Sequence, residues 1–270
     1  KAIGAIPIIG ALMLAIGYTV VLGWIFKYTF MSLSGSLFSL GTDMGAIGGT
    51  FGMTAPEAET LPEALKAMAS AGFFGIGNGV WQIVALVVSL AIMVMGVAGG
   101  IEKANKIMMP VLVVLAVVVT IYSVTRPGAV EGVKYFLIPN VKNFSWMTVV
   151  AAMGQMFYSL SIAMGILYSY GSYVRKDMDI ERSTTQVEVF DTGIAILAGL
   201  MIIPAVFSFS GGNPETLQAG PSLMFITLPK VFASMGFGTA TGIVFFILVL
   251  LAALTSAVSL METSVSTFME

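Results

Sequence analysis

The sequence has no cysteine and no histidine among its 270 residues. The first absence excludes disulfides, a thiol nucleophile and a thiolate metal site, and the second removes the commonest metal ligand and the readiest proton relay. Charge is also scarce, because charged residues make up 10% of the chain, against about 25% in soluble proteins. The net charge of −2 leaves no basic surface that would bind nucleic acid.

What is present is mostly apolar. Hydrophobic residues make up 57% of the chain and the mean hydropathy is +0.97. A helix needs about 20 apolar residues to cross the hydrocarbon core of a bilayer, and six stretches are suited to do so. We therefore predict an all-α, polytopic membrane protein with six transmembrane helices. Their approximate ranges are 6–31, 79–97, 107–123, 153–173, 186–209 and 239–268.

Charge gathers between the spans. Two short polar turns, "GGIEKANK" and "RKDMDIERS", are expected on one side of the membrane. Three longer connections, 32–70, 126–146 and 210–236, are expected on the other side. The first should be loop-like and should then form a short amphipathic helix, and the second suits an interfacial helix. Basic residues divide six against six, with Lys27 counted on the side of the longer connections. Because the positive-inside rule acts on short loops, we expect the two short turns to face the cytoplasm.

The fourth span, "MGQMFYSLSIAMGILYSYGSY" (153–173), has the length of a membrane helix but a polar centre. It carries Gln155, Ser159 and Ser161, with glycines on either side. A single serine in a span often bonds to its own helix, but glycine costs about 1 kcal/mol relative to alanine in a helix. Non-helical backbone at membrane depth persists only where it lines a cavity or is buried in protein. We predict a discontinuous helix here, whose freed amides and carbonyls bind an anionic group or a cation such as Na⁺.

Polar residues in the last two spans each allow two interpretations. Asp191 lies past the charged turn and before a long uncharged run, so it either marks a functional site or reaches water from near a helix end. Glu262 is also close to a span end, and its longer side chain favours the second interpretation. Thr255, Ser256 and Ser259 offer hydroxyl oxygens in mid-span, as ligands for an alkali cation or as small residues for helix packing.

A set of motifs extends over nearly the whole chain: "AIGYTVVLGW", "GQMFYSLSIAMG", "YGSYVRKDMDI", "DTGIAILAGLMIIPAVF", "AGPSLMFITLP" and "LAALTSAVSLME". Together they resemble the neurotransmitter:sodium symporter family, especially its bacterial amino-acid transporters. The resemblance implies the leucine-transporter-type fold with inverted repeats. Residues 1–270 would form a single transmembrane domain that matches the third to eighth family helices, with the first two and the last four absent. The expected location is the bacterial inner membrane.

The resemblance also implies two sodium sites. Ser159 and Asp191 match ligands of the first ion, and the Ala252 carbonyl with the Thr255 and Ser256 hydroxyls matches the second. The family's first helix, absent from this chain, would complete both sites.

The substrate pocket follows from the same resemblance. Tyr18 matches a tyrosine that binds the substrate carboxylate, and Tyr158 matches the aromatic lid that faces it. The full set of predicted substrate-binding residues is Leu14, Tyr18, Tyr158, Ser159, Ser161, Met164, Ser256 and Leu260.

Three residues depart from the family's usual pattern. Ala163 stands where glycine is common in the discontinuous helix. Met164 stands where phenylalanine is common, and its flexible side chain should admit larger apolar substrates. Asp191 stands where asparagine is common, so Asp191 and Gln155 would form a charge-balance site that makes chloride unnecessary.

The predicted function is sodium-coupled symport of a hydrophobic or aromatic L-amino acid by alternating access. The expected partners are the amino acid, sodium ions and the lipid bilayer, without nucleic acid. The alternative is a non-transporting amino-acid sensor of the same architecture, which would need the same site. An intramembrane enzyme is disfavoured, because Asp191 has no second intramembrane aspartate to pair with and the chain has no histidine or cysteine.

Overall fold

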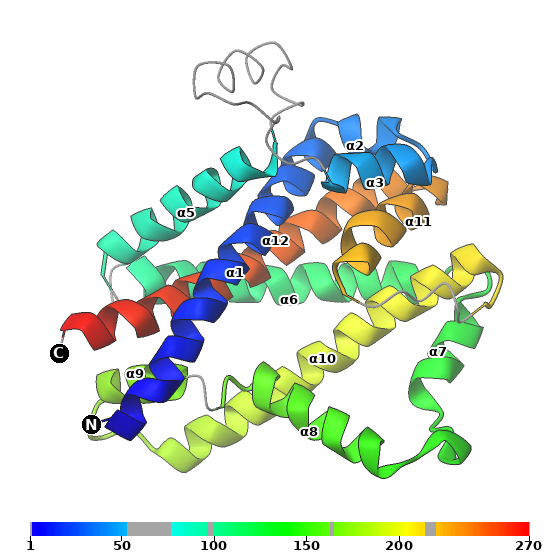
Figure 1. Ribbon diagram of the computed structural model, residues 1–270. Helices are drawn as coiled ribbons and strands as arrows, with labels where there is room; N and C mark the ends of the chain where they lie inside the picture. The colour runs from blue at the N-terminus through cyan, green and yellow to red at the C-terminus, as the bar shows by residue number, and fades with distance from the viewer. Residues whose placement is uncertain (1, 53–76, 97–99, 163–164, 214–219, 270) are drawn as a thin grey trace, which may run out of the picture.

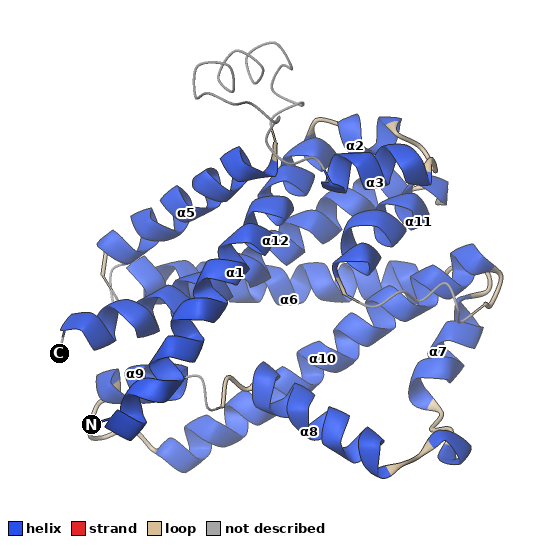
Figure 2. Ribbon diagram, viewed as in Figure 1, coloured by secondary structure: helices blue, strands red, loops and turns tan. Residues whose placement is uncertain are grey.

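The computed structural model describes residues 2–52, 77–96, 100–162, 165–213 and 220–269 (Figure 1). Within these ranges the chain is helical and has no strand (Figure 2), so the prediction of an all-α fold is confirmed. The elements are α1 (Ala2–Leu33), α2 (Ser36–Ser39), α3 (Met44–Gly52), α5 (Asn78–Val94), α6 (Glu102–Val124), α7 (Ala129–Leu137), the 3-10 helix η3 (Val141–Asn143), α8 (Trp146–Ser159), α9 (Ile166–Tyr173), α10 (Ile180–Ser210), the π-helix η5 (Leu223–Thr227), α11 (Leu228–Ser234) and α12 (Gly238–Met269).

Among the described residues, four helices are long and apolar enough to cross a membrane: Ile9–Leu33 of α1, all of α6 and α10, and Gly238–Ser266 of α12. The second predicted span is α5, an apolar helix of 17 residues. The fourth predicted span is divided into α8 and α9.

Two of the helices that begin earlier than hydropathy predicts have polar residues that cap them. The Ser145 amide donates a hydrogen bond to Thr148 Oγ1 at 3.2 Å, and α8 therefore begins at Trp146. Asp179 Oδ1 accepts a hydrogen bond from the Arg182 amide at 3.1 Å and starts α10 well before residue 186. A helix that leaves the membrane can continue in water when a cap satisfies its first amides.

The core is built around α1 and α12, which lie side by side, with α5 along α1 and with α10 against α6 (Figure 1). Aromatic residues fill the space between α1, α12 and η5, and Tyr28, Phe225 and Phe246 are almost fully buried there. Lipid is as apolar as these side chains, so close packing rather than escape from water holds such helices together.

The contact between α1 and α5 is close enough to require glycine at position 23. A Cβ atom on Gly23 would lie 2.7 Å from the backbone nitrogen of Gln82. We expect Gly23→Ala to force the two helices apart and to destabilise the protein by about 1–3 kcal/mol. Gly17→Ala on the same helix is the control, since its Cβ would meet nothing within 4 Å. Equal thermal unfolding midpoints for the two variants in detergent would contradict this packing.

The position of Lys27 corrects the prediction that counted it among the basic residues of the loops. It lies inside α1 and is only 1% exposed, rather than standing in a loop. Its ammonium group donates to the Thr50 carbonyl at 2.7 Å and to Asn78 Oδ1 at 2.9 Å, while Asn78 Nδ2 donates to the Phe51 carbonyl at 3.0 Å. Lys27 and Asn78 therefore bind the last carbonyls of α3 and connect α1, α3 and α5.

Two of the predicted connections are more ordered than their composition suggests. The segment after the first span, predicted to be loop-like, forms α2 and α3, because Gly35 reverses the chain with a φ of 78° and Asp43 Oδ1 caps α3 through the Gly45 amide at 2.8 Å. The amphipathic helix predicted before residue 70 lies outside the described residues. The predicted interfacial helix forms as α7, which lies crosswise to α6 and α10 (Figure 1).

Candidate functional site

The fourth span breaks immediately after Ser159. The Ile162 amide donates to the Phe157 carbonyl at 2.9 Å and the Ser161 amide to the Tyr158 carbonyl at 3.1 Å, which is a Schellman motif. Ser161 takes the left-handed position of that motif with a φ of 56°, and Gly165, with a φ of 78°, precedes α9. The predicted discontinuity is therefore confirmed. Ala163 and Met164 lie outside the described residues, so the role of Met164 stays a prediction.

Ser161 holds a backbone conformation that costs a non-glycine residue about 1–2 kcal/mol. We expect Ser161→Gly to keep the break and to retain ligand binding, because glycine adopts this conformation freely. Ser161→Val should lower the unfolding midpoint and weaken binding, since β-branched residues are genuine outliers at positive φ. Thermal unfolding and equilibrium binding of the two variants check this, and equal behaviour would show that the left-handed turn has no importance for the site.

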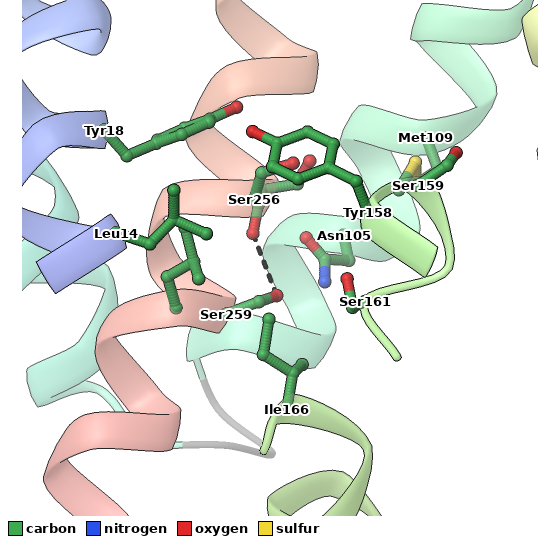
Figure 3. A pocket seen from close by; sticks show the side chains of 12 residues that line it. Leu14, Tyr18, Asn105, Met109, Tyr158, Ser159, Ser161, Ile166, Ser256 and Ser259 are labelled. Carbon is green, nitrogen blue, oxygen red and sulfur yellow. Dashed lines mark hydrogen bonds between the residues drawn. The ribbon is translucent and has the colours of Figure 1, made fainter. Parts of the chain in front are cut away.

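A cavity of about 300 Å³ opens beside the break, between α1, α6, α8, α9 and α12 (Figure 3). It brings together all the predicted substrate-binding residues that the structure describes. The lining residues are Leu14, Tyr18, Asn105, Met109, Tyr158, Ser159, Ser161, Ile166, Thr255, Ser256, Ser259 and Leu260.

Five of these residues were not among the predicted substrate-binding residues. Thr255 was assigned to sodium instead, and the other four had only weak signals in the sequence. Ser259 was noted as a polar residue in mid-span, but without a pocket role. Asn105 falls in the predicted polar turn "GGIEKANK", whereas the structure places it in the first turns of α6. Ile166 and Met109 are apolar residues in apolar helices, and nothing in the sequence distinguishes them from lipid-facing neighbours.

The two tyrosines close one end of the cavity. Tyr18 comes from α1 and Tyr158 from the last turn of α8, and their hydroxyl groups point toward one another above Ser256 (Figure 3). Leu14 and Leu260 add an apolar wall, in a small cluster with the buried Ala15. The cavity therefore combines an apolar wall with hydroxyl groups, the composition expected for a small organic ligand.

Ser159 and Asp191, the two residues predicted to bind the first sodium ion, contact one another. Ser159 Oγ donates to Asp191 Oδ1 at 2.6 Å, a short bond because its acceptor is charged. Asp191 makes no ion pair with any residue in the described ranges. Gln155 is exposed one turn earlier on α8, and the described part of the chain contains no hydrogen bond between it and Asp191. The structure thus joins Asp191 to Ser159 but not to Gln155.

The second predicted cation site lies on α12. Thr255 Oγ1 and Ser256 Oγ both donate to the Ala252 carbonyl, at 2.8 and 3.1 Å. A carbonyl oxygen has two lone pairs, so a cation at Ala252 would have to displace at least one of these hydroxyl hydrogens. Both hydroxyls keep lone pairs for a ligand.

The oxygen donors suit a monovalent cation better than a transition metal. Hydroxyl and carbonyl oxygens are hard ligands of low charge, and Asp191 is the single carboxylate among the predicted ligands. Within the described residues no three acidic side chains gather as a metal cluster.

Polar contacts join α9 to α12 below the cavity. Tyr170 Oη and Ser259 Oγ lie 2.9 Å apart, and Tyr173 donates to Glu262 Oε1 at 2.8 Å. Glu262 therefore bonds to α9, and it does not line the cavity.

Comparisons with known proteins agree on one family. The profile of the sodium:neurotransmitter symporter family matches residues 53–270. The chain is 34% identical over 250 residues to YhdH, an uncharacterized sodium-dependent transporter of Bacillus subtilis (strain 168), covering 93% of this chain and 50% of that protein. It is 30% identical over 275 residues to an uncharacterized sodium-dependent transporter of Haemophilus influenzae, covering 100% of this chain and 55% of that protein.

A solved structure is also similar. The crystal structure of MhsT in complex with L-phenylalanine matches with a TM-score of 0.73 and 35% identity, covering 98% of this chain and 55% of that one. The chain spans about half the length of the curated relatives named above.

Proposed function

Because this chain belongs to the sodium:neurotransmitter symporter family, we propose that it forms part of a sodium-coupled symporter for a hydrophobic or aromatic L-amino acid. Its helices are a fragment of the leucine-transporter-type fold, in a multi-pass membrane protein. The bacterial inner membrane is the proposed location. The relatives are named as transporters, and we propose no catalytic reaction.

The cavity at the helix break is the observation that supports this proposal most strongly. Its volume of about 300 Å³ is at the lower end of the range for small-molecule sites, which is about 300–1,000 Å³. Leu14 and Leu260 would contact the substrate side chain, while Tyr18 and Tyr158 would close over it. The related MhsT was crystallised with L-phenylalanine, which is consistent with an apolar substrate here.

Sodium would bind at two places along the cavity. We assign Ser159 and Asp191 to the first ion, and Ala252, Thr255 and Ser256 to the second. The proposed remaining ligands come from the family's first helix, in the roughly half of the relatives' length that this chain does not span. The carboxylate of Asp191 would balance part of the charge of the bound ions, so chloride would not be required.

Uptake into proteoliposomes tests the function. The full-length protein should accumulate labelled leucine, phenylalanine or tryptophan when sodium is high outside, and should not do so when choline replaces sodium. It should also exchange labelled for unlabelled amino acid in counterflow. Sodium-dependent binding without uptake or exchange would instead establish the alternative, a non-transporting sensor, and the absence of binding would contradict both functions.

A further inference from the structure

The end of the cavity away from the two tyrosines contains one hydroxyl group whose hydrogen bonds can be fully assigned. Ser259 lies there on α12, close to Leu14 and Ile166 and opposite Tyr18 and Tyr158 (Figure 3). Its Oγ atom makes two contacts, one with the Thr255 carbonyl at 3.0 Å and one with Tyr170 Oη at 2.9 Å.

Both contacts can exist together in only one way. A carbonyl oxygen accepts hydrogen bonds and never donates them. Ser259 must therefore donate its single hydrogen to the Thr255 carbonyl. The contact with Tyr170 then requires Tyr170 to donate and Ser259 to accept.

This assignment leaves the serine–tyrosine pair without a hydrogen to offer a ligand. Ser259 Oγ keeps one free lone pair, and Tyr170 Oη also keeps only acceptor capacity. The surrounding cluster consists of Ala15, Ile166 and Leu260, which are apolar, with Leu14 beside them. A ligand atom that contacts Ser259 therefore meets a hydrogen-bond acceptor beside an apolar wall, whereas Asn105 and Ser161, which also line the cavity, keep donors of their own.

We infer that Ser259 Oγ selects an apolar amino-acid side chain that carries a hydrogen-bond donor, as the indole N–H of tryptophan does. This inference rests on the proposed function and makes it more specific. A side chain without a donor, such as that of phenylalanine or leucine, would still fit the apolar wall but would leave the Ser259 lone pair without a partner.

A matched pair of ligands isolates this hydrogen bond. L-Tryptophan and L-benzothienylalanine have nearly the same shape, and sulfur replaces the N–H group in the second compound. The full-length wild-type protein, with sodium present, should bind tryptophan about tenfold more tightly, the effect of one net hydrogen bond. In Ser259→Ala this preference should disappear, and continued sodium-dependent binding of benzothienylalanine shows that the variant is folded.

Two further variants make the test specific. Tyr170→Phe should keep the preference, because Ser259 still donates to Thr255 and still presents a lone pair. Ser264→Ala is the matched control, since Ser264 lies on the same helix, bonds back to the Leu260 carbonyl in the same way and does not line the cavity. It should leave both affinities unchanged.

The possible outcomes distinguish a failure of this inference from a failure of the proposed function. Equal binding of the two compounds to the wild type would overturn the inference alone. So would a preference that persists in Ser259→Ala but disappears in Asn105→Ala, because the donor would then be recognised by α6. A wild type that binds leucine or phenylalanine in the presence of sodium but neither of these two compounds would also overturn the inference alone. Failure to bind any of the four amino acids in the presence of sodium would overturn the proposed function and this inference with it.

Discussion

Uptake by the full-length protein is expected to continue unchanged when gluconate replaces chloride, and Asp191→Asn is expected to abolish uptake or make it chloride-dependent. Two sodium ions and a zwitterion carry excess positive charge, which is costly in a site of low dielectric constant. Asp191 supplies a fixed negative charge and accepts the 2.6 Å hydrogen bond from Ser159. Replacing a charged acceptor costs about 1.5–3 kcal/mol, so apparent sodium affinity in the variant should fall by at least about tenfold.

Glu188→Gln provides the matched control for this experiment. Glu188 is an exposed carboxylate on α10, one turn before Asp191, and Ser159 donates its hydrogen bond to Asp191 rather than to Glu188. Its replacement removes the same charge from the same helix and should leave uptake independent of chloride. A wild-type protein that loses uptake in gluconate, or two variants that behave alike, would contradict the charge argument.

The second large effect concerns the hydroxyl groups of α12. The double variant Thr255→Ala, Ser256→Ala should weaken apparent sodium affinity by about tenfold or more, since each lost ligand hydrogen bond or ion contact contributes about 1 kcal/mol. The protein should remain folded, because both hydroxyls bond back to their own helix at Ala252. The loss of the Ser256 hydroxyl also removes its hydrogen bond with Tyr18 of α1, so amino-acid affinity at saturating sodium is measured beside the sodium dependence.

Sodium titrations of amino-acid binding measure this effect directly. Thr241→Ala is the control, since Thr241 bonds back to the Phe237 carbonyl at 3.0 Å near the opposite end of the same helix. An unchanged sodium dependence in the double variant would remove Thr255 and Ser256 from the second site. An equal loss of sodium affinity in Thr241→Ala would show that the substitutions perturb α12 as a whole rather than remove ligands of the sodium ion.

Hydropathy was sufficient to predict the helical class and the approximate spans, because lipid leaves the backbone no other partner than its own helix. The break in the fourth span could also be predicted, since Ser159 and Ser161 lie between glycines in mid-span. Polar residues and glycines there do not stabilise a continuous membrane helix. The exact residue at which the helix breaks depends on the left-handed backbone conformation of Ser161. Serine has no preference for that conformation, so the sequence could not predict it.

Other features depend on contacts between distant segments, and the sequence gives no local signal for them. Asn105 was assigned to a turn, and only the packing of α6 brings it to the cavity. The pairing of Tyr170 with Ser259 joins residues 89 positions apart. Lys27 was counted as a loop charge because its partners, Thr50 and Asn78, lie on two later helices.

The buried position of Lys27 has a consequence for how the protein is made. The chain is synthesised from its N-terminus, so α1 reaches the membrane before α3 and α5 can pack against it. Lys27 lies six residues before the end of α1, about 9 Å along the helix axis, and until then its ammonium group must reach up to the lipid headgroups. We therefore expect α1 to settle at its final depth only after α3 and α5 have been translated and have brought Thr50 and Asn78 to the Lys27 ammonium group.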